Sequence, residues 1–348
     1  MDNKSLLEII NPKSNSTVLV YDVHASESGA LSILNDFYVQ VRNYSDKSVK
    51  WVFIVSKPDY AKSNNIKVER YPWVKKSWFH RLFFENITTK KILKKYKPDI
   101  VFSLQNKGIN NYNGKQIAYL HLPFILTNYK FKFFRDGKQL WLYQNVLKKI
   151  IFNSLRKVNK VIVQTKWMKD ELIKQANING DNIVLCAPNI NMNNIGKYKQ
   201  ANKITFFYPA TAFFYKNHIT ILKAINYLNN KISNYEIVFT INEKENKCSK
   251  ELKDYANKFN INVRFIGKMS RDKVFQLYEK SILLFPSYVE SFGLPLLEAR
   301  ETKCPIIASD QPFSREILKD YDGVLYYKTD DYIDMAYKIE IMVNKLRG

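Results

Sequence analysis

The chain has 348 residues, of which 46% are hydrophobic, so it is long enough for two cores rather than one. No apolar run approaches the roughly 18 residues needed to span a bilayer, and the start lacks the cationic and apolar segments of a secretory signal. Three widely spaced cysteines argue against a disulfide framework and a zinc site, and favour reduced thiols in a cytoplasmic protein.

The formal net charge of +23 is unevenly distributed along the chain. Residues 67–157 hold 20 Lys/Arg but only four Asp/Glu, a net charge of +16, interleaved with many aromatic residues. Such a composition is typical of a surface for nucleic acid or for an anionic membrane. Lys- and Asn-rich codon usage in an AT-rich genome explains part of the total charge, but it does not explain the clustering.

Short apolar runs alternate with helical patterns along the whole chain, which predicts an α/β fold with parallel sheets. The runs predict strands over 17–23, 50–56, 98–104, 116–122, 160–164, 183–187, 204–208, 235–240, 262–266, 281–286, 305–308 and 323–327. Helical patterns cover 30–42, 79–96, 138–157, 218–228, 251–259, 271–280 and 295–301.

This order predicts two doubly wound domains. We expect a first domain over 1–190, a polar linker over 191–202 and a second domain over 203–330. A last helix over 331–348 is expected to pack back toward the first domain. Ligands of such sheets bind at the carboxyl ends of the strands, so we expect a central cleft there.

Several common enzyme signatures are missing from the sequence. It has no Walker A motif, no GxGxxG, no GxSxG and no HExxH. The absence of the first two motifs argues against a P-loop NTPase and a dinucleotide oxidoreductase. The remaining signals concern the recognition of phosphate and hydroxyl groups.

The strongest of these signals is the segment 281–298, SILLFPSYVESFGLPLLE. It predicts a buried strand, a turn and a helix that opens on Pro295, where a missing N–H costs nothing. Glu290 and Glu298 flank the helix N-terminus, which favours anions, and Gly293 lets a ligand approach the backbone. The alternative interpretation is that both glutamates are first-turn acids that stabilise the helix dipole.

Three further positions suit an anionic or hydroxyl-bearing ligand less specifically. Lys216 precedes a predicted helix and could neutralise a diphosphate, or it could be an ordinary solvated lysine. His121 ends a predicted strand, where an imidazole can donate to a hydroxyl or phosphate or can be a structural residue. Gly29 allows close backbone approach at the first helix N-terminus.

Residues 265–310, FIGKMSRDKVFQLYEKSILLFPSYVESFGLPLLEARETKCPIIASD, resemble the donor-binding block of GT-B-fold glycosyltransferases of family 4. YKNH at 215–218 is similar to that family's phosphate-binding lysine segment. In the first half the resemblance covers the SGA turn at 28–30, YLHLPF and VIVQTKWMK. It implies two Rossmann-like domains that face a central cleft.

The resemblance also implies residue roles. Glu298 would accept from the ribose of a nucleotide sugar, and Glu290 would contact the transferred sugar. Lys216 would balance the leaving diphosphate, and His121 would lie near the reacting sugar. The remaining donor-binding residues would be Ser291, Phe292, Gly293, Leu294, Gly29, Gly267 and Lys268.

The chain departs from the family pattern at two places. A Gly-Arg pair usually precedes the lysine, but Ala210 and Thr211 stand here, so one diphosphate cation is missing. Lys268 or Arg271 could replace it. The paired glycines after the first strand are reduced to Gly29.

The resemblance therefore implies a retaining, metal-independent hexosyltransferase with no cofactor beyond its nucleotide-sugar co-substrate. The acceptor would be a lipid-linked glycan of bacterial surface-polysaccharide synthesis, with mannose as one candidate donor sugar. The enzyme would work at the inner face of the inner membrane, with residues 67–157 on anionic lipid and without nucleic acid. The alternatives are a nucleic-acid-binding protein on an inactive GT-B fold, and a GT-B epimerase or phosphorylase.

Overall fold

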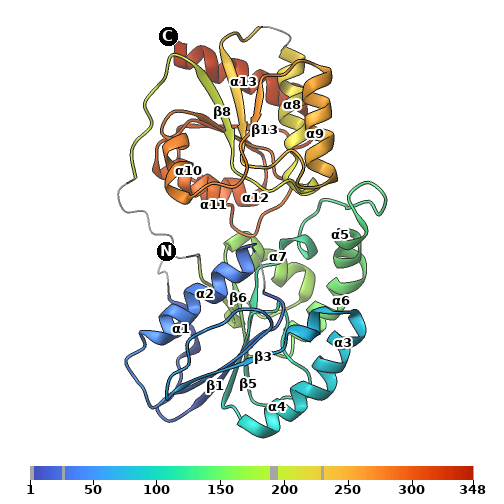
Figure 1. Ribbon diagram of the computed structural model, residues 1–348, viewed down its shortest axis with the longest axis vertical. Coiled ribbons are helices and arrows are strands. Elements are labelled where there is room, and N and C mark those ends of the chain that lie inside the picture. The colour runs from blue at the N-terminus through green and yellow to red at the C-terminus, as the bar shows by residue number, and fades with distance from the viewer. Residues whose placement is uncertain (1–3, 26–27, 189–194, 229–230, 348) are drawn as a thin grey trace. The chain divides into compact units, whose positions relative to one another are not determined.

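The computed structural model describes residues 4–25, 28–188, 195–228 and 231–347. The chain forms two compact units, each built around one parallel sheet (Figure 1). Unit 1 comprises residues 1–126 and 138–189, and unit 2 comprises residues 127–137 and 190–348. The segment 127–137 therefore belongs with unit 2, although it lies within the part of the sequence expected to form the first domain.

Unit 1 contains a seven-stranded sheet in the order β3-β2-β1-β4-β5-β6-β7, and all of its pairings are parallel. Its strands are β1 (Thr17–Asp22), β2 (Lys50–Val55), β3 (Ile66–Arg70), β4 (Ile100–Ser103), β5 (Lys115–Leu120), β6 (Lys160–Val163) and β7 (Ile183–Leu185). The strand order reverses between β1 and β4, which makes this pair the topological switch point of unit 1.

The α-helices of unit 1 are α1 (Leu6–Ile10), α2 (Ser28–Arg42), α3 (Trp78–Phe83), α4 (Thr89–Tyr96), α5 (Lys138–Leu142), α6 (Lys148–Leu155) and α7 (Lys166–Ala176). Two π-helical turns, η2 (Phe84–Thr88) and η4 (Tyr143–Leu147), join α3 to α4 and α5 to α6. Short 3₁₀ turns are η1 (Pro72–Lys75), η3 (Pro123–Ile125) and η5 (Gly180–Asn182). The two basic helices predicted over 79–96 and 138–157 are confirmed, each with one π turn inside it.

Both faces of the unit 1 sheet are covered, because successive residues of a strand point to opposite faces. Val20 of β1 packs with Phe37 of α2 on one face. Tyr21 packs with Phe84 of η2 and Ile92 of α4 on the other. The interiors of the central strands are therefore apolar on both faces, which is the pattern of a buried parallel sheet.

Unit 2 contains a six-stranded parallel sheet in the order β10-β9-β8-β11-β12-β13. Its strands are β8 (Ile204–Tyr208), β9 (Tyr235–Phe239), β10 (Val263–Phe265), β11 (Ile282–Phe285), β12 (Ile306–Ser309) and β13 (Val324–Tyr327). Its helices are η6 (Phe214–Lys216), α8 (His218–Leu228), α9 (Lys247–Lys258), α10 (Arg271–Tyr278), α11 (Leu294–Glu301), α12 (Pro312–Ile317) and α13 (Tyr332–Arg347). The strand order reverses between β8 and β11.

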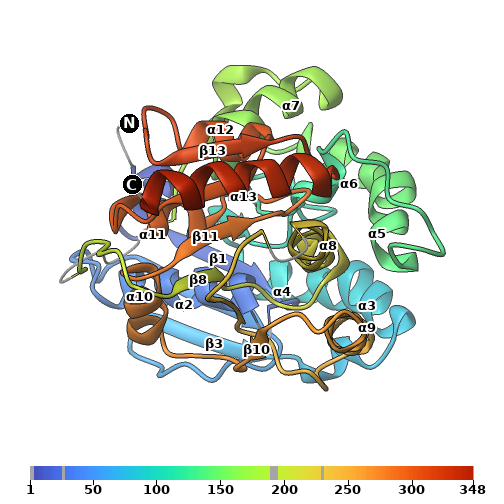
Figure 2. The same cartoon turned by 90° about the horizontal axis from the view of Figure 1, so that it is seen from above.

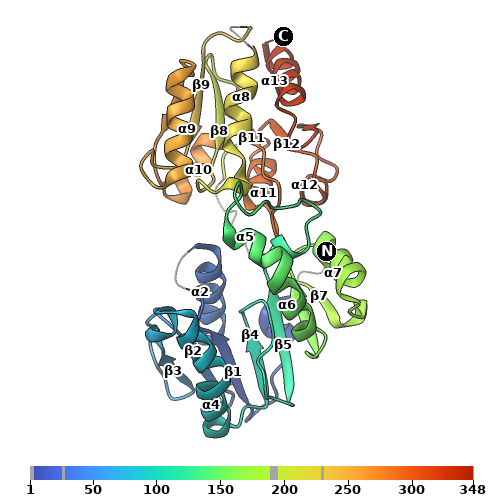
Figure 3. The ribbon, with the colours of Figure 1, turned by 90° about the vertical axis from the view of Figure 1, so that its right-hand side faces the viewer.

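The helices of unit 2 pack in two groups. α8 contacts both α9 and α13, whereas α11 contacts α10 and α12 (Figure 3). α13 also packs against β12 and β13 (Figure 2). The packing of residues 331–348 toward the first domain stays a prediction, and residues 189–194 of the linker region lie outside the described residues.

The doubly wound α/β class is confirmed, and every predicted strand is present. β3, α1, α7 and α12 were not predicted. β3 reads IKVER, so three of its five residues are charged, and as an edge strand it needs no continuous apolar run. α1 and α12 have only five and six residues, which is too short for a helical period to show.

Candidate functional site

The predicted residues Lys216 and Glu290 lie at the switch point of unit 2. β8 and β11 are neighbours, with Phe206 opposite Ile282 and Phe207 opposite Leu283. Lys216 follows β8 and Glu290 follows β11, so both side chains come from loops at the carboxyl ends of adjacent strands. This is the position at which open α/β sheets bind ligands.

Lys216 and Glu290 form an ion pair. The Lys216 Nζ lies 2.5 Å from Oε1 of Glu290, and each side chain is less than one fifth exposed. The Ser287 hydroxyl donates to the same carboxylate oxygen over 2.7 Å. Lys216 is thus a nearly buried cation whose counter-charge is Glu290. From the sequence it could have been either a functional or a solvated lysine.

The two loops that carry the pair are tied to each other. The Tyr208 hydroxyl donates to the Lys216 carbonyl over 3.0 Å and lies 2.8 Å from the Ser287 hydroxyl. The Tyr288 N–H donates to the Tyr215 carbonyl over 2.9 Å. The ion pair is therefore held by backbone and side-chain bonds that do not involve its own charges.

Burial lowers the pKa of Lys216, but the carboxylate of Glu290 and the neighbouring Tyr215 more than offset this, so the pKa lies above its usual value. Lys216 is therefore a cation at neutral pH. A cation at the carboxyl ends of β8 and β11 can stabilise negative charge that develops on a ligand.

Glu298 lies deeper than Glu290, on α11. The helix begins at Leu294 after Gly293, whose φ of +90° favours glycine, and its first turn contains no acidic residue. Glu298 follows that first turn and is 9% exposed. The interpretation of Glu298 as a first-turn acid that stabilises the dipole is therefore wrong.

Two residues of α10 hold the Glu298 carboxylate. The Tyr278 hydroxyl donates to Oε2 over 3.2 Å, and Arg271 Nη2 lies 3.2 Å from Oε1. Burial raises the pKa of Glu298, while Arg271 and Tyr278 oppose that rise. Arg271, considered from the sequence as a replacement diphosphate cation, is thus paired with Glu298 in this structure.

The remaining predicted residues of unit 2 lie in two segments, the turn that leads into α11 and the turn after β10. Phe292 is buried, whereas Leu294 is 40% exposed at the start of α11, and Ser291 precedes them in the same turn. Gly267 follows β10 with a φ of +70° and open space where a Cβ would project. Lys268 beside it is exposed.

The segment 127–137 packs beside the loops of Lys216 and Glu290. Tyr129 stacks on Tyr288, with ring centroids 4.3 Å apart, and the Arg135 guanidinium lies 5.4 Å from the centroid of the Phe214 ring. Phe214 and Tyr288 each lie two residues from a member of the ion pair. This support was not predicted, because it joins segments far apart in sequence without any local pattern.

The other two predicted residues, Gly29 and His121, belong to unit 1. Gly29 lies in the first turn of α2, and His121 directly follows β5. The His121 N–H donates to Oδ1 of Asn106 over 2.8 Å, and burial lowers the pKa of His121 to about 4. His121 is therefore neutral at physiological pH and can act as a hydrogen-bonding group.

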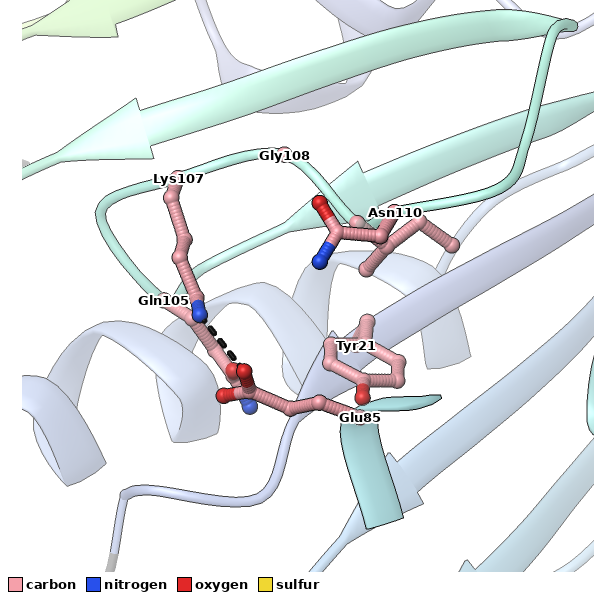
Figure 4. A pocket seen from close by; sticks show the side chains of 7 residues that line it. Tyr21, Glu85, Gln105, Lys107, Gly108 and Asn110 are labelled. Atoms are coloured by element: carbon pink, nitrogen blue, oxygen red, sulfur yellow. Dashed lines mark hydrogen bonds and ion pairs between the residues drawn. The ribbon is translucent and has the colours of Figure 1, made fainter. Parts of the chain in front are cut away.

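A polar cluster that the sequence did not reveal lies at the switch point of unit 1. Tyr21, Glu85, Gln105 and Lys107 line a cavity of about 10 Å³, the size of one water molecule (Figure 4). Lys107 Nζ lies 2.8 Å from Oε2 of Glu85. The amide of Gln105 is buried, and neither of its polar atoms has a hydrogen-bond partner within the described ranges. The cavity is therefore suited to a polar guest.

Asp22 lies at the end of β1, close to this cluster along the chain. Burial raises its pKa to about 7, although the N–H groups of Ala25 and His24 donate to Oδ1 over 3.0 and 3.2 Å. Burial also lowers the pKa of His24 well below its usual value, helped by Arg81, Lys107 and Lys75. Among the described residues no group of three or more His, Cys, Asp or Glu could hold a metal ion.

We expect Asp22→Asn to change how stability depends on pH. The pKa of Asp22 is raised above its unfolded value of about 3.9, so the folded state binds the proton more tightly. The wild type should therefore lose stability relative to the variant as the pH rises from 4 to 7, by more than about 1 kcal/mol. Urea unfolding at several pH values measures this, with the exposed Asp59→Asn as the control. Parallel curves for Asp22→Asn and wild type would refute the burial argument.

We expect Lys216→Met to destabilise the protein by about 1–3 kcal/mol, because it leaves the Glu290 carboxylate nearly buried without its counter-charge. The double variant Lys216→Met/Glu290→Gln should recover part of that loss. Lys223→Met on the exposed side of α8 is the matched control. Equal unfolding midpoints for Lys216→Met and Lys223→Met would show that the pair contributes nothing.

Comparison with known families matches both halves of the chain. The family described as "Glycosyl transferases group 1" matches residues 191–345, and "Glycosyltransferase Family 4" matches residues 42–193. The first match contains Lys216, Glu290 and Glu298. Together the two matches leave only the first 41 and last three residues uncovered.

Two characterised relatives are similar to part of the chain. The "O-antigen chain mannosyltransferase RfbU" of Salmonella typhimurium is 23% identical over 204 residues, which are 56% of either chain. The "GalNAc-alpha-(1->4)-GalNAc-alpha-(1->3)-diNAcBac-PP-undecaprenol alpha-1,4-N-acetyl-D-galactosaminyltransferase" of Campylobacter jejuni is 30% identical over 132 residues. That match is 37% of this chain and 35% of the relative. The matched regions thus span about half and one third of these relatives.

Solved structures show the fold. HepE of Anabaena, solved in complex with UDP-glucose, superimposes with a TM-score of 0.66 at 13% identity, over 95% of this chain and 91% of that one. Both units of this chain have parallel sheets with a reversal of strand order. The chain therefore belongs to the group 1, family 4 glycosyltransferases and has the GT-B fold.

Proposed function

We propose that the protein is a hexosyltransferase that moves a sugar from a nucleotide-diphosphate sugar to a hydroxyl of a lipid-linked glycan. The observation that carries this proposal is the pairing of Lys216 with Glu290 at the switch point of unit 2, with Glu298 on the following helix. The names of the O-antigen mannosyltransferase and of the PP-undecaprenol glycosyltransferase support the acceptor class. UDP-glucose in HepE supports the donor class.

The proposed residue roles are those that the resemblance to family 4 implies, and the charges of the site are compatible with them. Glu298 accepts from the ribose hydroxyls, and Glu290 accepts from hydroxyls of the transferred sugar. Lys216 neutralises the charge that grows on the diphosphate as it leaves. Before donor binds, each carboxylate has a basic partner, Arg271 or Lys216, which holds it in place.

Backbone amides at 291–294, Gly267 and Lys268 would contribute further donor contacts, and Gly29 and His121 would contribute from unit 1. Within this proposal the reaction retains the anomeric configuration and needs no metal. The acceptor hydroxyl attacks from the face that the diphosphate leaves, and the departing phosphate takes its proton. Mannose is one candidate for the transferred hexose.

We also propose that the protein works at the cytoplasmic face of the inner membrane of a bacterium, where residues 67–157 contact anionic lipid. No helix in the described parts of the chain is both long and apolar enough to cross a membrane. The basic, aromatic composition of 67–157 supports a surface contact.

The donor class is tested first by binding. A thermal-shift screen with GDP-, UDP-, dTDP- and ADP-sugars should raise the melting temperature with one base only, because a ligand that binds the folded state alone stabilises it. An equal absence of shift for all four, beside tight binding to random oligonucleotides, would favour the inactive nucleic-acid-binding alternative.

Transfer is tested with the matching radiolabelled nucleotide sugar and lipid-linked acceptors from membranes. Glu298→Ala should lower kcat/KM by at least about a hundredfold, because the ribose loses its charged acceptor. Glu301→Ala, on the same helix and partly exposed, should leave transfer unchanged. Full activity of Glu298→Ala would contradict the site assignment.

Two further measurements test whether transfer needs a metal ion and whether it retains the anomeric configuration of the donor. Transfer should persist with EDTA at a concentration that chelates all divalent ions, and proton NMR of the first product should show the donor's anomeric configuration. Loss of transfer with EDTA, restored by one metal, would contradict the metal-independent part of the proposal. An inverted product would contradict the retaining part.

A further inference from the structure

We propose that the outer side of α3 and η2 is the surface by which this protein docks to an anionic lipid bilayer. This proposal deepens the proposed function, which places the acceptor in a membrane, and it identifies the docking element within residues 67–157. We call the surface the α3 stripe. It consists of five exposed apolar residues: Trp78, Phe79, Leu82, Phe83 and Ile87.

The spacing of the α3 stripe places its residues along one side of the helix. Trp78 and Phe79 lie one turn before Leu82 and Phe83, and Ile87 lies in the following π turn. Phe79 is 83% exposed, and the other four are between 43% and 55% exposed. A contiguous group of large apolar side chains on a surface marks a site of contact with a protein or a membrane.

The opposite side of the same segment is fixed to the core of unit 1. Phe84 is fully buried, with its ring centroid 4.9 Å from that of Tyr71 and 6.0 Å from that of Tyr21. The Thr89 hydroxyl donates to the Phe84 carbonyl over 2.9 Å and lies 2.7 Å from the Tyr21 hydroxyl. The helix therefore cannot turn the α3 stripe inward without breaking this packing.

The charges around the α3 stripe select an anionic partner. Residues 72–97 contain eight Lys/Arg and one acid, Glu85. Glu85 is nearly buried and pairs with Arg81 and Lys107, so it adds no negative charge to the outer surface. Exposed Lys90, Lys91 and Lys94 continue along α4 from the apolar end of the segment.

This combination fits a lipid interface better than nucleic acid. Trp and Phe insert at the boundary between head groups and acyl chains, while lysines keep their ammonium groups among anionic head groups. Leu82 and Ile87 have no flat ring on which a base could stack, but both can enter an acyl layer. Figures 1 and 2 show α3 at the periphery of unit 1, clear of its central strands.

Docking through this surface would also bring the polar cavity at the switch point of unit 1 close to the membrane, because the same helical segment contributes to both. Glu85, in the turn that follows α3, lines the polar cavity together with Gln105 and Lys107 (Figure 4). Arg81, on α3 itself, pairs with that glutamate. One helical segment thus offers apolar side chains to the bilayer and polar side chains to the carboxyl ends of β1 and β4, where a head-group-linked sugar could be received.

The test is sedimentation of the full-length protein with vesicles of phosphatidylcholine alone and with added phosphatidylglycerol. Wild type should bind the anionic vesicles at low salt and the neutral ones weakly. Phe79→Ser/Phe83→Ser should weaken binding by about tenfold or more, because two exposed rings no longer enter the bilayer. Ile341→Ser on α13, which removes a half-exposed apolar side chain from unit 2, should bind as wild type does.

The preference for anionic lipid and the insertion of the α3 stripe into the bilayer are tested separately. Lys90→Glu/Lys94→Glu should abolish the preference for anionic vesicles, whereas Lys250→Glu/Lys319→Glu, with the same change in net charge, should retain it. Tryptophan fluorescence should shift to the blue on vesicle addition, and Trp78→Phe should remove that shift while circular dichroism stays unchanged.

Equal vesicle binding by wild type and Phe79→Ser/Phe83→Ser would overturn the proposal, as would binding to random oligonucleotides without binding to vesicles. Failure of the proposed function is distinguishable, because it would remove transfer to a short-chain, water-soluble acceptor and leave vesicle binding intact. Failure of the docking surface would instead leave that transfer intact, with vesicle binding equal in wild type and Phe79→Ser/Phe83→Ser or absent from both.

Discussion

The reversal of strand order between β8 and β11 is the constraint on which the site of unit 2 depends. Two parallel strands whose crossover helices leave in opposite directions open a space at their carboxyl ends. Lys216 and Glu290 come from the two loops at this point, and their charges pair there at 2.5 Å. Without the reversal, a helix connection would cover that end of the sheet and the two side chains would not meet.

Much of the fold follows from the sequence because buried parallel strands have a simple signature, a short apolar run bounded by polar or turn residues. ILLF of β11 shows it clearly, while IKVER of β3 does not, because an edge strand buries only part of its surface. The packing of residues 127–137 against the rest of unit 2 could not be predicted from the sequence either. It depends on the stacking of Tyr129 on Tyr288, a contact between residues more than 150 positions apart.

The site was predictable to the extent that its residues lie in the segments that join a strand to the next helix. Lys216 lies between β8 and α8 and Glu290 between β11 and α11, and the sequence identified both. Ser287 lies in the same segment as Glu290, so the same signal could have found it. Tyr278 and Arg271 could not be found in this way, because their contact with Glu298 depends on how α10 packs against α11. Gly29 and His121 lie in unit 1, and their part in a shared site stays a prediction.

The central claim is that unit 2 binds the nucleotide diphosphate of a sugar donor at the carboxyl ends of β8 and β11. A crystal structure of the protein with the nucleoside diphosphate selected by the thermal-shift screen tests this most directly. We expect ribose hydroxyls within hydrogen-bonding distance of Glu298 and the diphosphate beside Lys216. A nucleotide bound elsewhere would contradict this claim, if the ion pairs Lys216–Glu290 and Arg271–Glu298 were unchanged and contacted only solvent.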